Sequence, residues 1–332
     1  MLPKREKLAD RLPLKTPFSV HIFPSYKCNF KCNYCIHAIS NAELKKRGFS
    51  KDVMNFNTFI NAIKGIKDYE SRIKALIFAG HGEPLLHPDI IKMVDLAKKE
   101  NIAERVEITT NASMLSKQMS DSLIDAGLDR LKISIQGTSE KKYKEISNHN
   151  LIYNDFIDNI KYFYSQKKHT EVYIKIIDIA LKDKQDEFYF KSIFSSISDY
   201  IDIEYAIPFV PQLDLSLIKN NFDKCKQGHA IHSEICSMPF YMQVVTPNGD
   251  VLPCCSIDIP IVLGNVNNES LKQLWESEQQ RKFLLTMLSD RESNKVCSRC
   301  SVPIYGLQEG DYLDSCKDKL LKAFENGAPN AS

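Results

Sequence analysis

The cysteines of this 332-residue chain fall into two groups, and their spacing limits what the chain can fold into. Three of the ten, Cys28, Cys32 and Cys35, lie within eight residues, and the other seven follow residue 224. Ten cysteines are too few for a disulfide scaffold of this length, and disulfides are rare in a reducing compartment. Two groups of cysteines therefore predict two metal-binding regions.

The composition is that of a globular chain with little net charge. Apolar residues make up 43%, and 44 basic residues against 42 acidic ones leave a formal charge of +2. So small an excess argues against a protein that follows a nucleic acid backbone. No run approaches the ~18 apolar residues of a membrane span, and the charged first 15 residues lack the apolar segment of a signal peptide. We expect a cytoplasmic protein that has neither nucleic acid nor a membrane as a partner.

Short β-rich runs alternate with helical patterns from residue 19 to residue 205, which is typical of β/α units around a parallel sheet. The predicted strands cover residues 19–24, 74–79, 105–110, 130–136, 171–179 and 201–205. The predicted helices cover residues 56–69, 88–100, 116–126, 140–164 and 184–197. Six units are fewer than the eight of a closed barrel, so we predict an α/β fold with a partial (β/α)6 TIM-like barrel. Its active site should lie at the carboxyl ends of the strands.

The pattern changes after Pro208. Residues 208–211 are typical of a linker, Asn248-Gly249 predicts the turn of a β-hairpin, and one helix is predicted over residues 269–289. We therefore divide the chain into four parts: an N-terminal extension (1–18), a barrel (19–207), a small hairpin-plus-helix domain (208–316) and a C-terminal tail (317–332).

Cys28, Cys32 and Cys35 form a C-x3-C-x2-C pattern directly after the first predicted strand. Three thiolates so close together can ligate three irons of one [4Fe–4S] cluster, which leaves the fourth iron open. A structural zinc normally needs a fourth ligand, and the bacterial ferredoxin run places four cysteines together. The pattern therefore favours a cluster with one open position.

This pattern, with Tyr34 before the last cysteine, resembles that of the radical S-adenosylmethionine (SAM) enzymes. The resemblance implies that the open iron binds SAM, and that an electron from the cluster cleaves SAM to a 5′-deoxyadenosyl radical. That radical abstracts a hydrogen atom from the substrate, while the protein positions the reactants and excludes water. An external one-electron reductant, such as flavodoxin or ferredoxin, is an implied partner.

Three further segments continue the resemblance. Residues 80–84 (GHGEP) resemble the family's G-G-E-P loop, with His81 in place of a glycine; residues 109–111 resemble its T-N-G turn, and residues 134–137 its S-x-D-G turn. Glu83 would bind the SAM ammonium by a charge-assisted hydrogen bond, or alternatively cap the next helix. The resemblance implies that the SAM-binding residues are Tyr34, Gly80, Gly82, Glu83, Pro84, Asn111, Ser134 and Gln136.

A second set of four cysteines lies in the last third of the chain: Cys236, Cys254, Cys297 and Cys300. Four thiolates suit either zinc or a fully ligated [4Fe–4S] cluster. The surrounding segment resembles the SPASM/twitch extension of radical SAM enzymes, and in particular the shorter form known from aminocyclitol dehydrogenases. The resemblance implies one auxiliary [4Fe–4S] cluster on these four cysteines. A zinc that stabilises a small lobe is the alternative.

Three cysteines are left over, and each is expected to be a small buried hydrophobe. Cys255 follows Cys254 and, by strand alternation, should point to the opposite face, where it could return a hydrogen atom to a substrate radical. Cys316 is an alternative distant ligand, and Cys225 has no predicted role.

The leading hypothesis is a radical SAM oxidoreductase that oxidises an alcohol carbon of a sugar- or cyclitol-like substrate and passes the second electron to the auxiliary cluster. With some 18 residues before the first strand, we expect no N-terminal peptide-binding module, which favours a small-molecule substrate. The alternatives are a peptide-modifying enzyme that makes a thioether or carbon crosslink, an epimerase that uses Cys255, and an iron–sulfur electron carrier. Candidates for the substrate pocket and its base are Lys175, Asp178, Glu204 and Tyr205.

Overall fold

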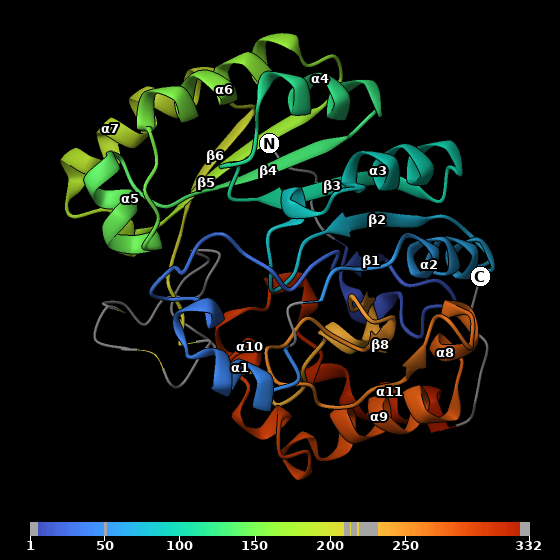
Figure 1. The fold of residues 1–332 in the computed structure, drawn as a ribbon. Helices are drawn as coiled ribbons and strands as arrows, with labels where there is room; N and C mark the ends of the chain where they lie inside the picture. The colour runs from blue at the N-terminus through green and yellow to red at the C-terminus, as the bar shows by residue number, and fades with distance from the viewer. Residues whose placement is uncertain (1–5, 50–51, 209–212, 214–217, 219–231, 326–332) are drawn as a thin grey trace.

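The computed structural model describes residues 6–49, 52–208, 213, 218 and 232–325. These residues form a nine-stranded sheet in the order β6-β5-β4-β3-β2-β1-β7-β8-β9 (Figure 1). The first six strands run parallel in chain order, which confirms the predicted α/β fold with a partial barrel. They are β1 (Ser19–Ile22), β2 (Ile73–Phe78), β3 (Ala103–Thr110), β4 (Arg130–Ile135), β5 (Glu171–Ile177) and β6 (Tyr200–Glu204).

The helices that connect these strands cover the outer face of the sheet (Figure 1). Their apolar stripes, such as Phe59, Ile63 and Ile66 in α2, are buried against the strands. The predicted helix over 140–164 is two helices, because Asn148 adopts a left-handed conformation (φ 50°) and ends the first of them. The connecting helices are α2 (Phe56–Lys67), α3 (Ile90–Lys99), α4 (Lys117–Asp125), α5 (Glu140–Ser147), α6 (Tyr153–Gln166) and α7 (Lys184–Phe194).

The predicted hairpin extends the barrel sheet. β7 (Met242–Val245) pairs in parallel with β1, and β8 (Asp250–Leu252) and β9 (Gly264–Asn265) follow antiparallel. Val245, Val251 and Trp275 belong to the same hydrophobic core as the barrel strands. The main core therefore continues across the predicted boundary at residue 207.

A second hydrophobic core lies around the last helices, α9 (Glu278–Ser289), α10 (Val302–Tyr305) and α11 (Lys317–Glu325). Leu8 and Ala9 of the predicted N-terminal extension are buried in it. The helix predicted over 269–289 is in fact α8 (Leu271–Trp275) and α9, which begins anew at the cap Ser277. Both ends of the described chain thus pack against the region that carries the second cysteine set.

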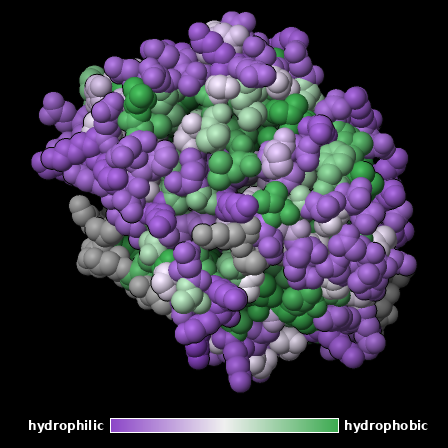
Figure 2. Space-filling model, in the orientation of Figure 1, coloured by the Kyte–Doolittle hydropathy of each residue, from purple (hydrophilic) through white to green (hydrophobic). Residues whose placement is uncertain are grey.

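The face seen in Figure 2 is largely hydrophilic, with apolar residues in several separate groups. Within the described part of the chain, every helix is too short or too polar to cross a bilayer.

Candidate active site

The first cysteine group lies in the loop between β1 and α1 (Asn41–Lys46). Two backbone hydrogen bonds anchor the loop to the end of α5, from Lys31 N to Ser147 O (2.8 Å) and from Asn33 N to Ile146 O (2.9 Å). The loop therefore lies at the carboxyl end of the barrel strands, where the sequence predicted the active site.

The three cysteine side chains of this loop need a positively charged group to stabilise their thiolate forms. Burial raises the pKa of Cys28 to about 12 and also raises the pKa values of Cys32 and Cys35, and the neighbouring thiolates add to the rise at Cys28 and Cys32. Iron ions would supply the positive charge that stabilises such thiolates. Phe30 N donates to Cys28 Sγ (3.4 Å), a contact of the kind that tunes cluster potentials. The donor set therefore fits a cluster held by three cysteines.

Close backbone packing joins the GHGEP loop to the cysteine loop. A Cβ atom on Gly82 would overlap the carbonyl oxygens of Ser25 and Lys27, so glycine is required there. Glu83 N, the next donor along the chain, binds Lys27 O at 2.8 Å. The two loops are therefore held in a fixed relation.

The Glu83 side chain is buried and already has three protein partners. Its carboxylate accepts hydrogen bonds from Leu85 N (2.9 Å), Thr110 Oγ1 (2.5 Å) and Asn111 N (2.7 Å). Burial raises its pKa to about 6, partly offset by these bonds. Glu83 thus joins the end of β2 to the end of β3 and caps a short helical turn, which was the alternative role; its contact with SAM stays a prediction.

Asn111 connects the end of β3 to the cysteine loop. Its Nδ2 donates to Asn29 Oδ1 (3.0 Å) and lies 4.0 Å from Cys28 Sγ, while its Oδ1 accepts from Ser113 N (2.9 Å). Sequence reasoning missed Asn29 and Ser113. The position of Asn29 between two cysteines was the available signal, whereas nothing marked Ser113.

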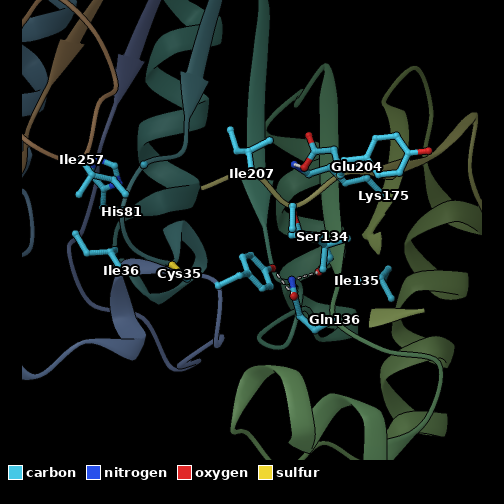
Figure 3. A pocket seen from close by; sticks show the side chains of 15 residues that line it. Cys35, Ile36, His81, Ser134, Ile135, Gln136, Lys175, Glu204, Ile207 and Ile257 are labelled. Carbon is cyan, nitrogen blue, oxygen red and sulfur yellow. Dashed lines mark hydrogen bonds and ion pairs between the residues drawn. The ribbon is translucent and has the colours of Figure 1, made fainter. Parts of the chain in front are cut away.

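A cleft opens at the ends of the barrel strands, beside Cys35 (Figure 3). Its volume is about 280 Å³, at the lower end of the roughly 300–1,000 Å³ typical of small-molecule sites. Four predicted SAM-binding residues line it: Tyr34, Gly80, Ser134 and Gln136. The other four, Gly82, Glu83, Pro84 and Asn111, are not among its lining residues.

One wall of the cleft is polar. Tyr34 Oη donates to Gln136 Oε1 (2.5 Å), and Gln136 Nε2 donates to the carbonyl of Ser134 (3.2 Å). On the same wall, Lys175 Nζ lies 2.5 Å from Glu204 Oε2, and the two side chains are 14% and 22% exposed. Figure 3 shows this ion pair on the side of the cleft away from His81.

Of the four residues predicted at the strand ends to form the substrate pocket, three line the cleft and one does not. Lys175, Glu204 and Tyr205 line the cleft. Asp178 does not, and its Oδ1 accepts a hydrogen bond from Ala206 N (2.7 Å). Asp178 therefore fixes the backbone that follows β6.

The second cysteine set surrounds a small cavity. All four predicted ligands line it, namely Cys236, Cys254, Cys297 and Cys300. Burial raises the pKa of Cys254 and of Cys300 to about 11. The described residues contain no group of three His, Cys, Asp or Glu side chains that could hold a single metal ion. Four thiols spread around one cavity fit a fully ligated [4Fe–4S] cluster.

Arg291 also lines this cavity, and sequence reasoning missed it. Its side chain is buried and donates to the carbonyl oxygens of Glu234 (2.9 Å) and Cys297. It thereby ties the segments that carry Cys236 and Cys297 together. No local signal predicts this contact, because 57 residues separate Arg291 from Glu234.

Of the left-over cysteines, Cys255 and Cys316 line neither of the cavities described above. β8 ends at Leu252, so the strand alternation expected for Cys255 does not apply. Cys255 Sγ lies 4.0 Å from Met238 Sδ, and Cys255 does not line the cleft. Cys316 does not line the four-cysteine cavity. Cys225 lies outside the described residues. Hydrogen donation by Cys255 stays a prediction.

His81 connects the cleft to the second cysteine set. It packs edge-on against Phe23 and Phe49, with ring centroids 5.1 Å apart in both pairs. Its Nε2 donates to the carbonyl of Ser256 (3.2 Å), two residues after Cys254. Burial lowers the pKa of His81 to about 4, which keeps the ring neutral. His81 thus packs among loop residues and also joins the barrel to the Cys254 loop.

Comparisons with known families agree with this geometry. The radical SAM superfamily matches residues 22–183, and the SPASM iron–sulfur cluster-binding domain matches residues 236–301. The chain is a radical SAM protein with a SPASM domain. These domains bind SAM on a [4Fe–4S] cluster and carry auxiliary iron–sulfur chemistry, so the expectation of an iron–sulfur site over a zinc site is confirmed.

Curated relatives of this radical SAM protein carry the name GTP 3′,8-cyclase. The one from Chlorobaculum tepidum is 31% identical over 144 residues, which are 43% of this chain and 40% of the relative. The one from Staphylococcus haemolyticus is 26% identical over 214 residues, which are 59% of this chain and 60% of the relative. The chain thus covers less than two thirds of either relative.

Solved structures share the fold. BtrN, in complex with AdoMet and 2-DOIA, superposes with a TM-score of 0.54 at 18% identity, covering 89% of this chain and 97% of BtrN. SuiB of Streptococcus suis, bound to the precursor peptide SuiA, gives a TM-score of 0.62 at 17% identity, covering 89% and 72%.

Proposed function

We propose that this radical SAM enzyme is a dehydrogenase that oxidises an alcohol carbon of a polyol, a sugar or cyclitol, and passes the second electron to the auxiliary cluster. The observation that carries the proposal is the contact between His81, which lines the cleft, and Ser256, two residues after the auxiliary ligand Cys254. Cys254 Sγ lies 3.3 Å from Ser256 Oγ. An electron acceptor bound to Cys254 would therefore be linked to the cleft wall through the contacts of Ser256 with Cys254 and with His81.

SAM and the substrate are proposed to meet at this cleft. When bound, the reduced cluster and SAM supply a 5′-deoxyadenosyl radical that abstracts a hydrogen atom. The cleft side of Cys35, with Tyr34, Ser134 and Gln136, offers polar groups to SAM. The Lys175–Glu204 pair on the same wall is proposed to contact the substrate, because its adjacent donor and acceptor match neighbouring hydroxyl groups.

Glu204 is the proposed base. After the carbon has lost its hydrogen atom, oxidation to a carbonyl requires loss of the hydroxyl proton and of one further electron. The Glu204 carboxylate takes the proton, and the electron leaves through the Cys254 side of the cleft. Lys175 holds Glu204 in place through the 2.5 Å contact.

The name of the curated relatives makes GTP an additional test substrate. Peptide modification stays an alternative, since SuiB, a structural neighbour, is bound to a precursor peptide. Because the matched part is at most 60% of the first two relatives, their activity is not carried over.

The test uses anaerobically reconstituted protein with SAM, dithionite and a panel of monosaccharides, cyclitols, aminocyclitols, short peptides and GTP. The expected result is a polyol that is oxidised to a carbonyl compound, with deuterium from its carbinol carbon appearing in 5′-deoxyadenosine. Turnover of GTP or of a peptide without any polyol oxidation would contradict the proposal.

A further inference from the structure

The cavity inside the second cysteine set has one charged residue in its wall besides its cysteines. Of the described residues that line it, Pro239, Phe283, Met287 and others are apolar, and Ser256 is neutral. Arg291 is the exception, because a guanidinium stays positively charged in proteins. A single cation therefore stands beside a cavity whose other ionisable groups are four thiols.

Arg291 is buried without a carboxylate partner. Only 6% of the residue is exposed, and within the described part of the chain no ion pair includes it. Its Nε donates to the carbonyl oxygen of Glu234 (2.9 Å), and its Nη1 donates to that of Cys297. Carbonyl groups carry only partial charges, and a buried full charge is costly unless an opposite charge lies nearby. The guanidinium therefore needs an anion that these two contacts do not supply.

The Arg291 charge acts on the thiols of this cavity. Burial raises the pKa of Cys297 to about 12 and that of Cys300 to about 11, and in both cases the Arg291 charge offsets part of the rise. Asp258 acts on Cys300 in the opposite sense, but its side chain is 50% exposed and is paired with Arg47 at 2.7 Å. Arg291 is therefore the buried charge at these two cysteines.

We propose that Arg291 is the counter-charge of the auxiliary cluster and raises the reduction potential of that cluster. A [4Fe–4S] cluster held by four thiolates is an anion, and reduction by one electron adds a further negative charge. A fixed positive charge in a site of low dielectric constant therefore stabilises the reduced form more than the oxidised form.

This inference deepens the proposed function, because a higher potential makes the auxiliary cluster a better electron acceptor. The substrate radical is oxidised by one electron, and the auxiliary cluster is reduced by the same electron. Arg291 itself exchanges neither an electron nor a proton. The potential is measured without substrate, so that a failure of this inference can be told apart from a failure of the proposed function.

The experiment measures the midpoint potential of the auxiliary cluster in the full-length, anaerobically reconstituted holoenzyme. Electron paramagnetic resonance spectra are recorded during a redox titration, and the auxiliary signal is the one that remains when the first three cysteines are replaced by Ala. Arg291→Met removes the charge and keeps a long side chain, whereas Arg291→Lys keeps the charge without the planar fork of donors. The control Arg299→Met removes the same charge from an exposed position between two of the four cysteines, outside the lining of the cavity.

We expect a lower potential in Arg291→Met. At a fixed solution potential, its ratio of reduced to oxidised auxiliary cluster should be lower than that of the wild type by about tenfold or more, which is about 59 mV for a one-electron couple. A unit charge a few ångströms away, at an effective dielectric constant of about 20, accounts for at least this effect. Arg291→Lys and Arg299→Met should stay within about threefold of the wild type, because the first keeps the charge and the second loses one that water and salt screen.

Three results would overturn the proposal. A wild-type potential in Arg291→Met would show that the charge does not act on the cluster. An equal decrease in Arg291→Lys would assign the effect to the hydrogen bonds, and an equal decrease in Arg299→Met would assign it to net charge alone.

Iron content covers the case in which Arg291→Met does not hold the auxiliary cluster. Iron would then fall from about eight to about four per chain. A cluster that is kept by Arg291→Lys at the wild-type potential would support the counter-charge, whereas its loss in both variants would overturn the proposal and leave Arg291 as a tie between two backbone segments. A shifted potential in an enzyme that oxidises no polyol would support this inference and reject the proposed function.

Discussion

The Nε2 atom of His81 donates a hydrogen bond to the carbonyl oxygen of Ser256 across 3.2 Å, and this contact joins two parts of the chain that lie 175 residues apart. His81 stands at the mouth of the barrel, and Ser256 follows the auxiliary ligand Cys254 by two residues. A second contact, Arg47 Nη1 to Asp258 Oδ1 (2.7 Å), ties the same loop to the segment after α1. The loop that carries Cys254 is thus held at two points, once by a residue of the cleft wall and once by the end of α1.

Removal of the His81 donor should loosen this connection. We expect His81→Phe, which keeps an aromatic ring beside Phe23 and Phe49, to lose a hydrogen bond of about 1 kcal/mol, a factor of about 5 in population. 5′-Deoxyadenosine formed per oxidised product should rise by about that factor, and the electron paramagnetic resonance (EPR) spectrum of the reduced auxiliary cluster should change. His81→Gln, which retains a donor, should restore both towards the wild type. Equal behaviour of the two variants would assign His81 to packing alone.

Glu204 should be needed for oxidation but not for SAM cleavage. Glu204→Gln keeps the shape of the side chain while removing the base and its charge. A general base typically contributes about 10²–10⁴-fold, so product formation should fall within that range, while 5′-deoxyadenosine still forms. Ser192→Ala, an exposed change on α7, serves as a control. Product formation by Glu204→Gln at the wild-type rate would show that another group takes the proton.

Substitution at Gly82 should disrupt the first cluster selectively. A Cβ atom at this position overlaps the carbonyl oxygens of Ser25 and Lys27, which precede Cys28. Gly82→Ala should therefore reduce the iron content from about eight to about four per chain, as expected for loss of one of two cubane clusters. Gly306→Ala, where φ is −108°, should keep the full iron content. Full iron in Gly82→Ala would mean that the loop tolerates the displacement.

His21 should make folding stability depend on pH. Burial, together with the nearby Lys132 charge, lowers the pKa of His21 from 6.5 to about 4. Between these two pKa values the unfolded chain binds more protons than the folded chain. The free energy of unfolding therefore increases with pH in this range, and stability decreases as the pH falls from 6.5 towards 4. His21→Phe should reduce the difference in unfolding free energy between pH 7 and pH 5 by up to about 2 kcal/mol. Urea titrations of anaerobic protein at both pH values measure this difference for the wild type and the variant. An equal difference in the two proteins would show that His21 is not its source.

The sequence predicts those features that local patterns encode. The six parallel strands, the C-x3-C-x2-C loop at their carboxyl ends and the gathering of Cys236 with Cys254, Cys297 and Cys300 follow from periodicity, spacing and resemblance. The broken helices were missed because Asn148 and Ser277 act through backbone conformation and capping inside otherwise continuous apolar patterns.

Contacts between distant segments were not predictable in this way. Pairing of β7 with β1, the Arg291 contacts and the His81–Ser256 bond each join residues far apart in the chain, and none leaves a local signal. Glu83 illustrates the limit within a motif. Its pattern implied a SAM contact, which stays a prediction, but did not indicate the Thr110 and Asn111 donors that bind its carboxylate.

The central claim is that the cluster on the first cysteine set binds SAM, whereas the auxiliary cluster on the second set does not. EPR spectroscopy of variants with a single cluster tests this claim most directly. Cys297→Ala/Cys300→Ala should leave only the first cluster, and Cys28→Ala/Cys32→Ala/Cys35→Ala only the auxiliary one. After reduction, addition of SAM should change the spectrum of the first cluster and leave that of the auxiliary cluster unchanged. An unchanged spectrum in the first variant, or a SAM-dependent change in the second, would contradict the account.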